Sequence, residues 1–154
     1  MTDKKPDFDI ATVHKYFSAT CFNKTWELID NPKRTPEEDM SILQMSMASL
    51  WHWSQREDAT SQNLSVGNWL VSRVYALLRQ ADNARRYADI SLKLAEGLKP
   101  FYVAFAYESL ARAEMVAGNN AKMNEYLEKA RALAEKVEDE EDKQVLVGDL
   151  ESIK

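Results

Sequence analysis

The sequence predicts an all-α protein, built as a right-handed stack of antiparallel helical hairpins with about seven helices. Glycine and proline each occur only four times in 154 residues, so few positions interrupt a helix. Apolar residues recur at spacings of three and four along most of the chain, whereas no segment shows the alternation of a strand. Residues 101–136 form two amphipathic stretches hinged at Gly118, Asn119 and Asn120, and such a hairpin is the unit of solenoid proteins.

One helical domain is expected over residues 1–154. A chain of this length buries roughly 70% of the surface that it exposes when unfolded, so its core needs no disulfide or metal. Within this domain we expect a flexible N-terminus at 1–8, a helical hairpin at 9–62, two further hairpins at 65–136 and a capping helix at 139–153.

Composition and charge argue against several classes of function. The net charge is -5, and a basic excess occurs only in residues 63–117, where seven Lys and Arg stand against five Asp and Glu. Because a nucleic-acid site needs a clustered basic face, no nucleic-acid partner is expected. No run of about 18 apolar residues occurs and residues 1–10 lack an apolar signal segment, so we expect no membrane span and no secretion. The single cysteine, Cys21, favours the reducing cytoplasm.

The start signals of the helices are clearest at Thr35. There a capping side chain is followed by Pro36 at the first helical position and by Glu38 three residues after the cap. Asp9 is expected to cap the first helix. The expected helices lie at about 9–29, 35–56, 65–80, 83–96, 101–117, 121–136 and 139–153, and a polar loop is expected at 57–63.

Three further features concern the second half of the chain. Asp82 or Asn83 is expected to cap the fourth helix. Residues 101–107 are apolar on every side, so the first two turns of the fifth helix should be sandwiched between other helices. The acidic run at 138–142 should start the last helix, since carboxylates oppose the positive end of its dipole.

The string AGNNAKMNEYLEKARAL at 117–133 resembles the second half of a tetratricopeptide repeat. The matching residues are Gly118, Tyr126, Lys129 and Ala130, preceded in the first helix by Tyr107, Leu110 and Ala111. Departures from the repeat occur at Glu114, Met123 and Glu135. The likeness to the repeat covers about 30 residues. It is weak over residues 65–100, and residues 1–62 contain no motif of the repeat. The strings LWHWSQRED and SRVYALLRQADNARRYA are also similar to bacterial helical proteins without an assigned activity.

In tetratricopeptide proteins the first helices of successive hairpins line a groove that receives peptides or helices of partners. The resemblance therefore implies a partner-binding site formed by Phe105, Glu108, Arg112 and Met115. Arg112 would donate two hydrogen bonds from its planar guanidinium to a carboxylate of the partner. The alternative is that Arg112 pairs with Glu108, one helical turn away, on the protein surface. The leading expectation is a noncovalent protein- or peptide-binding module without a cofactor.

A second candidate site surrounds Trp51, His52 and Trp53. Residues two apart on a helix point in different directions, so one of the two indoles should lie at a cleft, a second helix contact or a subunit interface. A wide buried face on a central helix would instead hide both rings. The two alternative functions are a structural homodimer formed through exposed aromatics, and an enzyme or small-molecule sensor. The pocket of that enzyme or sensor would be formed by Trp51, His52, Trp53, Arg56, Trp69 and Arg73.

No catalytic, cofactor-binding or metal-binding residue is expected, and the protein is not expected to be an enzyme. His14 and His52 are the only histidines, and neither has a second ligand at i+4. Cys21 is interpreted as a lone buried cysteine, although antiparallel packing of the first two helices would bring it near His14 or His52. The chain also lacks the GxxxxGK[ST], GxGxxG and GxSxG strings of phosphate loops and nucleophile elbows.

Overall fold

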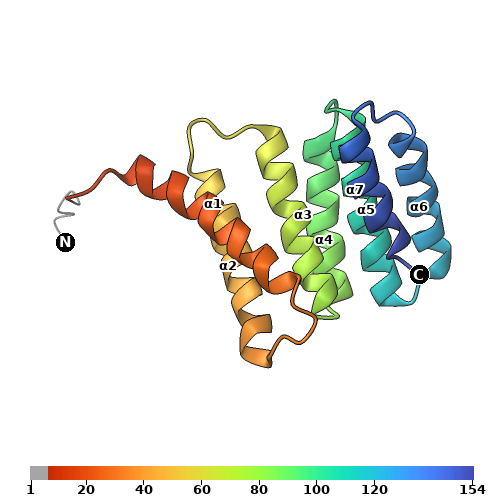
Figure 1. Ribbon diagram of the computed structural model, residues 1–154, viewed down its shortest axis with the longest axis horizontal. Helices are drawn as coiled ribbons and strands as arrows, with labels where there is room; N and C mark the ends of the chain where they lie inside the picture. Colours follow the sequence, from red (N-terminus) through yellow and green to blue (C-terminus); the bar gives the residue numbers. More distant parts are fainter. Residues whose placement is uncertain (1–6) are drawn as a thin grey trace. The chain divides into compact units, whose positions relative to one another are not determined.

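The computed structural model describes residues 7–154, and this part of the chain contains seven helices and no strand (Figure 1). The predicted all-α class is thereby confirmed for the described residues. The flexible N-terminus expected at 1–8 falls mostly outside them. The helices are α1 (Ile10–Ile29), α2 (Pro36–Ser54), α3 (Ser61–Leu77), α4 (Ala81–Ala95), α5 (Pro100–Ala117), α6 (Asn120–Ala134) and α7 (Glu140–Glu151).

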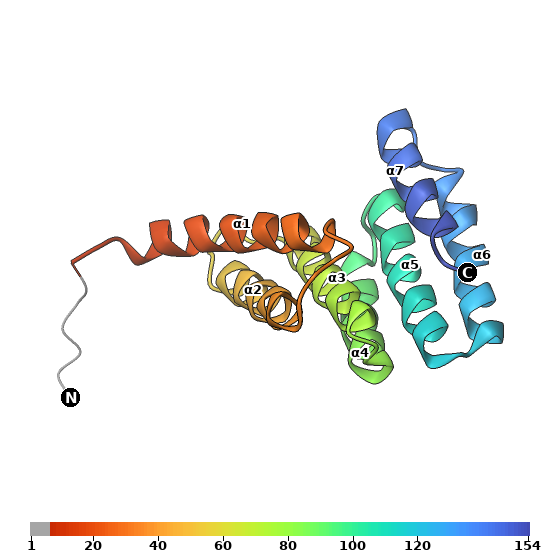
Figure 2. The same ribbon diagram turned by 60° about the horizontal axis from the view of Figure 1, so that its bottom comes forward.

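The chain divides into two compact units, an N-terminal unit at Met1–Ala59 and a C-terminal unit at Thr60–Lys154. The N-terminal unit contains α1 and α2, which pack together as a hairpin (Figure 2). The C-terminal unit contains α3 to α7. The division falls within the polar segment 57–63, and the single domain expected over 1–154 stays a prediction.

The N-terminal unit begins its helices as the sequence predicts. The carboxylate of Asp9 accepts hydrogen bonds from the backbone N–H groups of Ala11 and Thr12, and Thr35 and Glu38 form a complete capping box. The surface that the two helices share is lined by small polar side chains. Ser49 on α2 donates its hydroxyl hydrogen to the backbone oxygen of Ser18 on α1 at 2.7 Å. The buried side chains of this unit are Ser18, Thr25, Ile42, Ser46 and Ser49.

Two predicted boundaries are wrong. α3 begins at Ser61 instead of residue 65, because Thr60 caps it by accepting from the N–H of Asn63 while Asn63 accepts from the N–H of Thr60. α4 begins at Ala81 without any side-chain cap, so the caps expected at Asp82 or Asn83 do not form. A left-handed residue, Arg79 with φ 62°, redirects the chain just before α4. This left-handed turn closes the end of α3, where the N–H of Gln80 donates to the backbone oxygen of Tyr75, and no side chain caps α4.

In the C-terminal unit, α3 packs with α4 and α5 packs with α6, while α5 also contacts α3, α4 and α7. Gly118 ends α5 in the left-handed conformation, with φ 74°, and Asn119 caps α6, which confirms the predicted hinge. Burial along α5 is deepest at 108–114, where every side chain is buried, whereas most of residues 101–107 are only half-buried. None of residues 101–107 is exposed, in agreement with the expectation that these turns lie between other helices, but neighbouring helices enclose the second half of α5 more completely.

The apolar face of α7 completes the core of the C-terminal unit. Leu146, Leu150 and Ile153 pack in one buried cluster with side chains of α5 and α6. Asp139 caps α7, and three acidic side chains lie in its first turn, as the acidic run predicts. Figure 1 shows α7 beside both α5 and α6. This position of α7 determines how the candidate site beneath it is built.

Candidate functional site

A buried charge cluster lies on the side of the C-terminal unit formed by α3, α5 and α7. At its centre Glu108 has no exposed surface. Its Oε1 accepts from Arg73 at 3.1 Å and from Nε of Arg112 at 2.7 Å, and its Oε2 accepts from the indole N–H of Trp69 at 2.9 Å. Two guanidinium groups and a neutral donor therefore replace the water that a buried carboxylate loses.

The same two arginines hold α7 against this cluster. Arg112 donates to the backbone oxygen of Asp149 at 3.2 Å and to the hydroxyl of Ser152 at 2.8 Å. Arg73 approaches the carboxylate of Asp149 with a nitrogen–oxygen distance of 3.6 Å. Burial raises the pKa of Asp149, against the opposing effect of Arg73. The cluster therefore joins α3, α5 and α7 through charged hydrogen bonds.

This arrangement brings together residues that the sequence placed in two separate hypotheses. Glu108 and Arg112 come from the expected partner site, whereas Trp69 and Arg73 come from the alternative pocket. The pairing of Glu108 with Arg112 is confirmed, but its expected surface location is wrong, because Arg112 is only 8% exposed. The reason is that α7 covers this face. Contact between Arg112 and a partner stays a prediction.

An apolar pocket of about 190 Å³ lies next to the charge cluster. The ring of Trp69 meets Phe105 edge to face at 5.2 Å between centroids, and Phe105 meets Phe101 in the same way at 4.9 Å. The hydroxyls of Ser65 and Ser91 are each bonded to the backbone oxygen of the other residue. The pocket is lined by Ser65, Val66, Trp69, Ser91, Phe101, Tyr102, Phe105 and Val145.

The four residues of the expected partner site are thus distributed over different surroundings. Phe105 lines the apolar pocket, whereas Glu108 and Arg112 belong to the charge cluster beside it. Met115 is half-buried against the core formed with α6 and α7. The signal for the pocket in the sequence is the apolar start of α5 together with Trp69, but Val145 on α7 could not be predicted to join them.

The second candidate site lies in the N-terminal unit. The Nδ1 atoms of His14 on α1 and His52 on α2 are 2.8 Å apart, so one ring donates a hydrogen bond to the other. Burial, and secondly the charge of His14, lowers the pKa of His52. Trp51 is exposed and meets His14 edge to face, whereas Trp53 is half-buried beneath the guanidinium of Arg56, 3.8 Å from its ring centroid. The two indoles therefore occupy different environments, as their spacing predicts.

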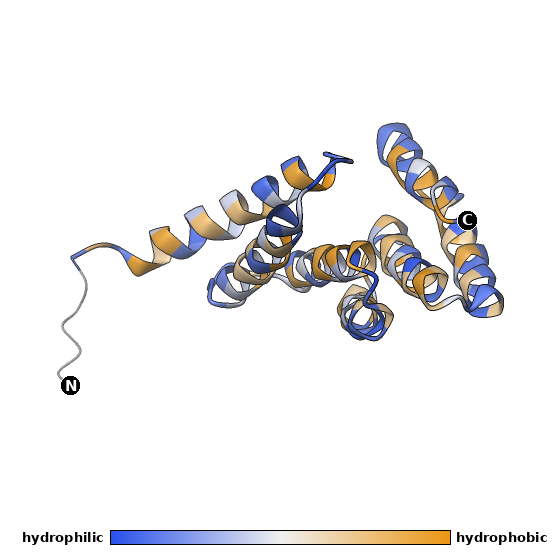
Figure 3. Ribbon diagram, turned by 90° about the horizontal axis from the view of Figure 1, so that it is seen from below, coloured by the Kyte–Doolittle hydropathy of each residue, from blue (hydrophilic) through white to orange (hydrophobic). Residues whose placement is uncertain are grey.

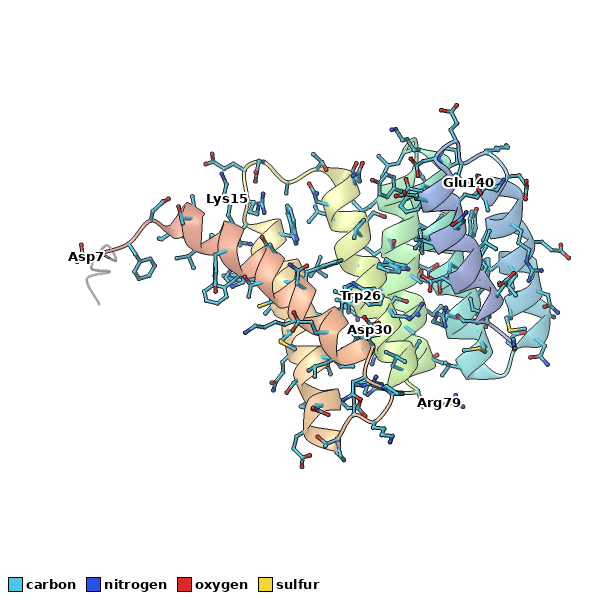
Figure 4. The ribbon with its side chains drawn as sticks, viewed as in Figure 1. Asp7, Lys15, Trp26, Asp30, Arg79 and Glu140 are labelled. Atoms are coloured by element: carbon cyan, nitrogen blue, oxygen red, sulfur yellow. The ribbon has the colours of Figure 1, made fainter. Side chains whose placement is uncertain are left out.

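A polar pocket of about 380 Å³ opens between the start of α1 and the segment after α2. Arg56 donates to both carboxylate oxygens of Asp58 at 2.8 Å and to the hydroxyl of Ser18 at 3.0 Å. These bonds from Arg56 are the main reason that the pKa of Asp58 falls to about 2. Lys15 lies on the same part of α1 (Figure 4). The lining residues are Ile10, Ala11, His14, Lys15, Gln55, Arg56, Glu57 and Asp58.

The six residues of the alternative pocket fall into the two units. Trp51, His52, Trp53 and Arg56 belong to the N-terminal unit, whereas Trp69 and Arg73 belong to the C-terminal unit. His14 lines the polar pocket, but His52 is not among its lining residues. The enzyme or sensor built on all six residues therefore stays a prediction.

Residues 7–154 show neither a metal-ion cluster nor a membrane-spanning helix. No group of three His, Cys, Asp or Glu side chains in this range is placed to hold a metal ion. Cys21 is a half-buried free thiol, not a fully buried one, and burial raises its pKa. No helix in the described part of the chain is both long and apolar enough to cross a membrane.

No family model, curated protein or solved structure matches this chain. The resemblance of residues 117–133 to a tetratricopeptide repeat, and the likeness to bacterial helical proteins, therefore stay predictions.

Proposed function

We propose that the protein is a noncovalent peptide-binding module, and that the apolar pocket of the C-terminal unit receives one bulky apolar side chain of a partner peptide. The supporting observation is an aromatic pocket fixed by a buried charge cluster. Its volume of about 190 Å³ is smaller than the roughly 300 Å³ at which pockets for drug-sized ligands begin, so a single side chain fits it better than a cofactor.

Rigidity of the pocket wall favours binding. The indole ring of Trp69 faces Phe105 in the pocket, while its N–H group is bonded to Glu108. Glu108 is in turn fixed by Arg73 and Arg112. A wall that is already ordered loses little conformational entropy when a ligand arrives, so more of the contact energy remains as affinity. Tryptophan is also among the residues that contribute most at binding surfaces.

The chemistry of the lining favours binding over catalysis. Six of the eight lining residues are apolar or aromatic. The other two, Ser65 and Ser91, have their hydroxyls bonded within the buried contact between α3 and α4. Nucleophilic catalysis needs an activated side chain beside a general base, and these serines are held by backbone oxygens instead.

A selection from a random peptide library displayed on phage tests the proposal. Selected peptides should share a bulky apolar residue and bind the wild-type chain. Val145→Glu places a charge at the exposed rim of the pocket and should weaken binding at least about tenfold. Ile90→Glu, at an exposed apolar position of α4 that does not line the pocket, is the matched control.

The measurement is fluorescence anisotropy with the selected peptides, after circular dichroism has shown that both variants fold. The proposal requires that Ile90→Glu binds as wild type does and Val145→Glu does not. Equal binding by both variants, or selected peptides without a common apolar residue, would contradict it.

A further inference from the structure

Exposed apolar side chains are concentrated in the N-terminal unit. Among residues 7–154, six of the nine large hydrophobic side chains that are exposed belong to this unit. Four of them, Ile10, Tyr16, Phe17 and Trp51, define what we call the α1 patch. Figure 3 shows apolar segments recurring along α1, the first helix after the N-terminus. Ile10 also lines the polar pocket, but Tyr16, Phe17 and Trp51 line neither that pocket nor the peptide pocket proposed above.

The rings of the α1 patch are connected. Tyr16 meets Phe17 edge to face at 5.1 Å between centroids, Phe17 stacks on His52 at 5.4 Å, and His52 meets Trp51 at 4.9 Å. Tyr16 is 60% exposed, Phe17 42% and Trp51 55%. Ile10 precedes Phe17 by two helical turns and so lies on the same side of α1. The three aromatic rings are therefore connected through His52, and Ile10 lies two turns away on the same side of α1 as Phe17.

The area of this surface suits a small dimer interface. With roughly 150–250 Å² for each large side chain, the exposed fractions leave roughly 400 Å² of apolar surface on the patch. Apolar atoms supply roughly 60% of a typical interface, so the patch and its polar rim would bury roughly 650 Å² per copy. Two copies would bury roughly 1,300 Å², which lies within the range of specific, stable interfaces.

The charges that flank the patch are self-complementary. Ile10, Phe17 and Lys24 are spaced by seven residues and share one side of α1. In an antiparallel pair of α1 helices related by a twofold axis at Phe17, Lys24 of each copy lies beside Ile10 and Asp9 of the other. The Oδ1 atom of Asp9 accepts one hydrogen bond, from Ala11, so it retains capacity for a lysine.

We infer that the α1 patch is the interface of a homodimer, in which two copies of this chain pack their α1 helices in antiparallel orientation. The rings around Phe17 form the apolar centre, and two Asp9–Lys24 ion pairs lie at the ends. A parallel pair would place like charges beside each other and lose these contacts. The dimer is independent of peptide binding by the C-terminal unit.

Sedimentation equilibrium of the full chain tests this inference. The wild type should sediment as a dimer of the 17.7 kDa chain, with dissociation on dilution from about 100 µM to about 1 µM. Phe17→Glu places two carboxylates at the twofold axis and should raise the dissociation constant at least about a hundredfold. Met40→Glu is the matched control, because Met40 is an exposed apolar residue of α2 in the same unit but outside the patch.

The ion pairs have a separate readout. Asp9→Asn keeps a good helix cap and Lys24→Gln removes the opposite charge, so each should weaken the dimer about threefold to tenfold at low salt. The double variant should weaken it by less than the product of the two single effects. A monomeric wild type at about 100 µM would overturn the inference. So would equal effects of Phe17→Glu and Met40→Glu in variants shown to be helical by circular dichroism.

Discussion

Glu108 links three helices of the C-terminal unit through a single carboxylate. It accepts from Trp69 and Arg73 on α3 and from Arg112 on its own helix, and both arginines also contact α7. Buried ion pairs add little net stability compared with apolar packing, but removal of one partner leaves an uncompensated charge. The cluster is therefore sensitive to a change that removes the negative charge and preserves the shape of the side chain.

Glu108→Gln should lower the free energy of unfolding by about 3 kcal/mol, because two guanidiniums then face a neutral amide in a buried site. The shift is measured as a lower urea midpoint with an unchanged slope. Glu125→Gln is the control, since Glu125 is exposed and pairs with Lys129 on the surface of α6. Equal urea midpoints for the two variants would show that the cluster contributes no specific stability.

The spacing of Glu108 and Arg112 along the helix was sufficient to predict their ion pair but not its burial. Their other partners lie 35 to 40 residues away, on α3 and α7. Local patterns report neighbours one helical turn apart, whereas burial depends on which distant helix covers the face. The hydrogen bond between His14 and His52 could not be predicted for the same reason, because 38 residues separate the two rings. Side-chain interactions within one helix could thus be predicted from the sequence, whereas interactions between helices could not.

The helix starts show which local sequence signals identify the boundary of an element. Thr35, Pro36 and Glu38 combine three independent signals, and the structure has the predicted capping box there. Thr60 forms an equivalent box with Asn63, which replaces the usual Glu or Gln, inside a polar segment without apolar periodicity. The start of α4 has no side-chain cap, so no residue type could indicate it. The predicted loop at 57–63 was therefore too long.

The cap at Thr60 leads to a prediction for α3. Thr60→Ala removes the side-chain oxygen that accepts from the N–H of Asn63, and should cost about 1 kcal/mol of unfolding free energy. Thermal unfolding should shift downward by about 2–4 °C. Ser61→Ala, at an exposed position one residue later, is the control and should melt within about 1 °C of the wild type. Coincident melting of all three proteins would contradict a stabilising cap.

The two units differ in how much apolar surface they bury. All fully buried apolar side chains in residues 7–154 belong to the C-terminal unit, with the exception of Ile42. The C-terminal unit therefore has a core of its own, built largely from α5 and the helices around it. In the N-terminal unit, a two-helix hairpin, Ser49 bonds to Ser18 across the helices, and the large apolar side chains of residues 7–59 other than Ile42 are only half-buried or exposed. A hairpin of this kind rarely folds without a further surface.

This difference predicts how fragments behave. A chain of residues 60–154 should be helical and unfold cooperatively in urea, because it retains the whole core of α3 to α7.

A peptide of residues 7–59 should have little helix at about 1 µM, where no partner surface covers its apolar side chains. Its helix content should rise with concentration if the α1 patch associates, and Phe17→Glu should abolish that rise. Circular dichroism across the concentration series measures both effects. A fully helical 7–59 peptide at the lowest concentration would show that the contacts between α1 and α2 alone suffice to fold this unit, and a non-cooperative 60–154 chain would show that its core depends on the N-terminal unit.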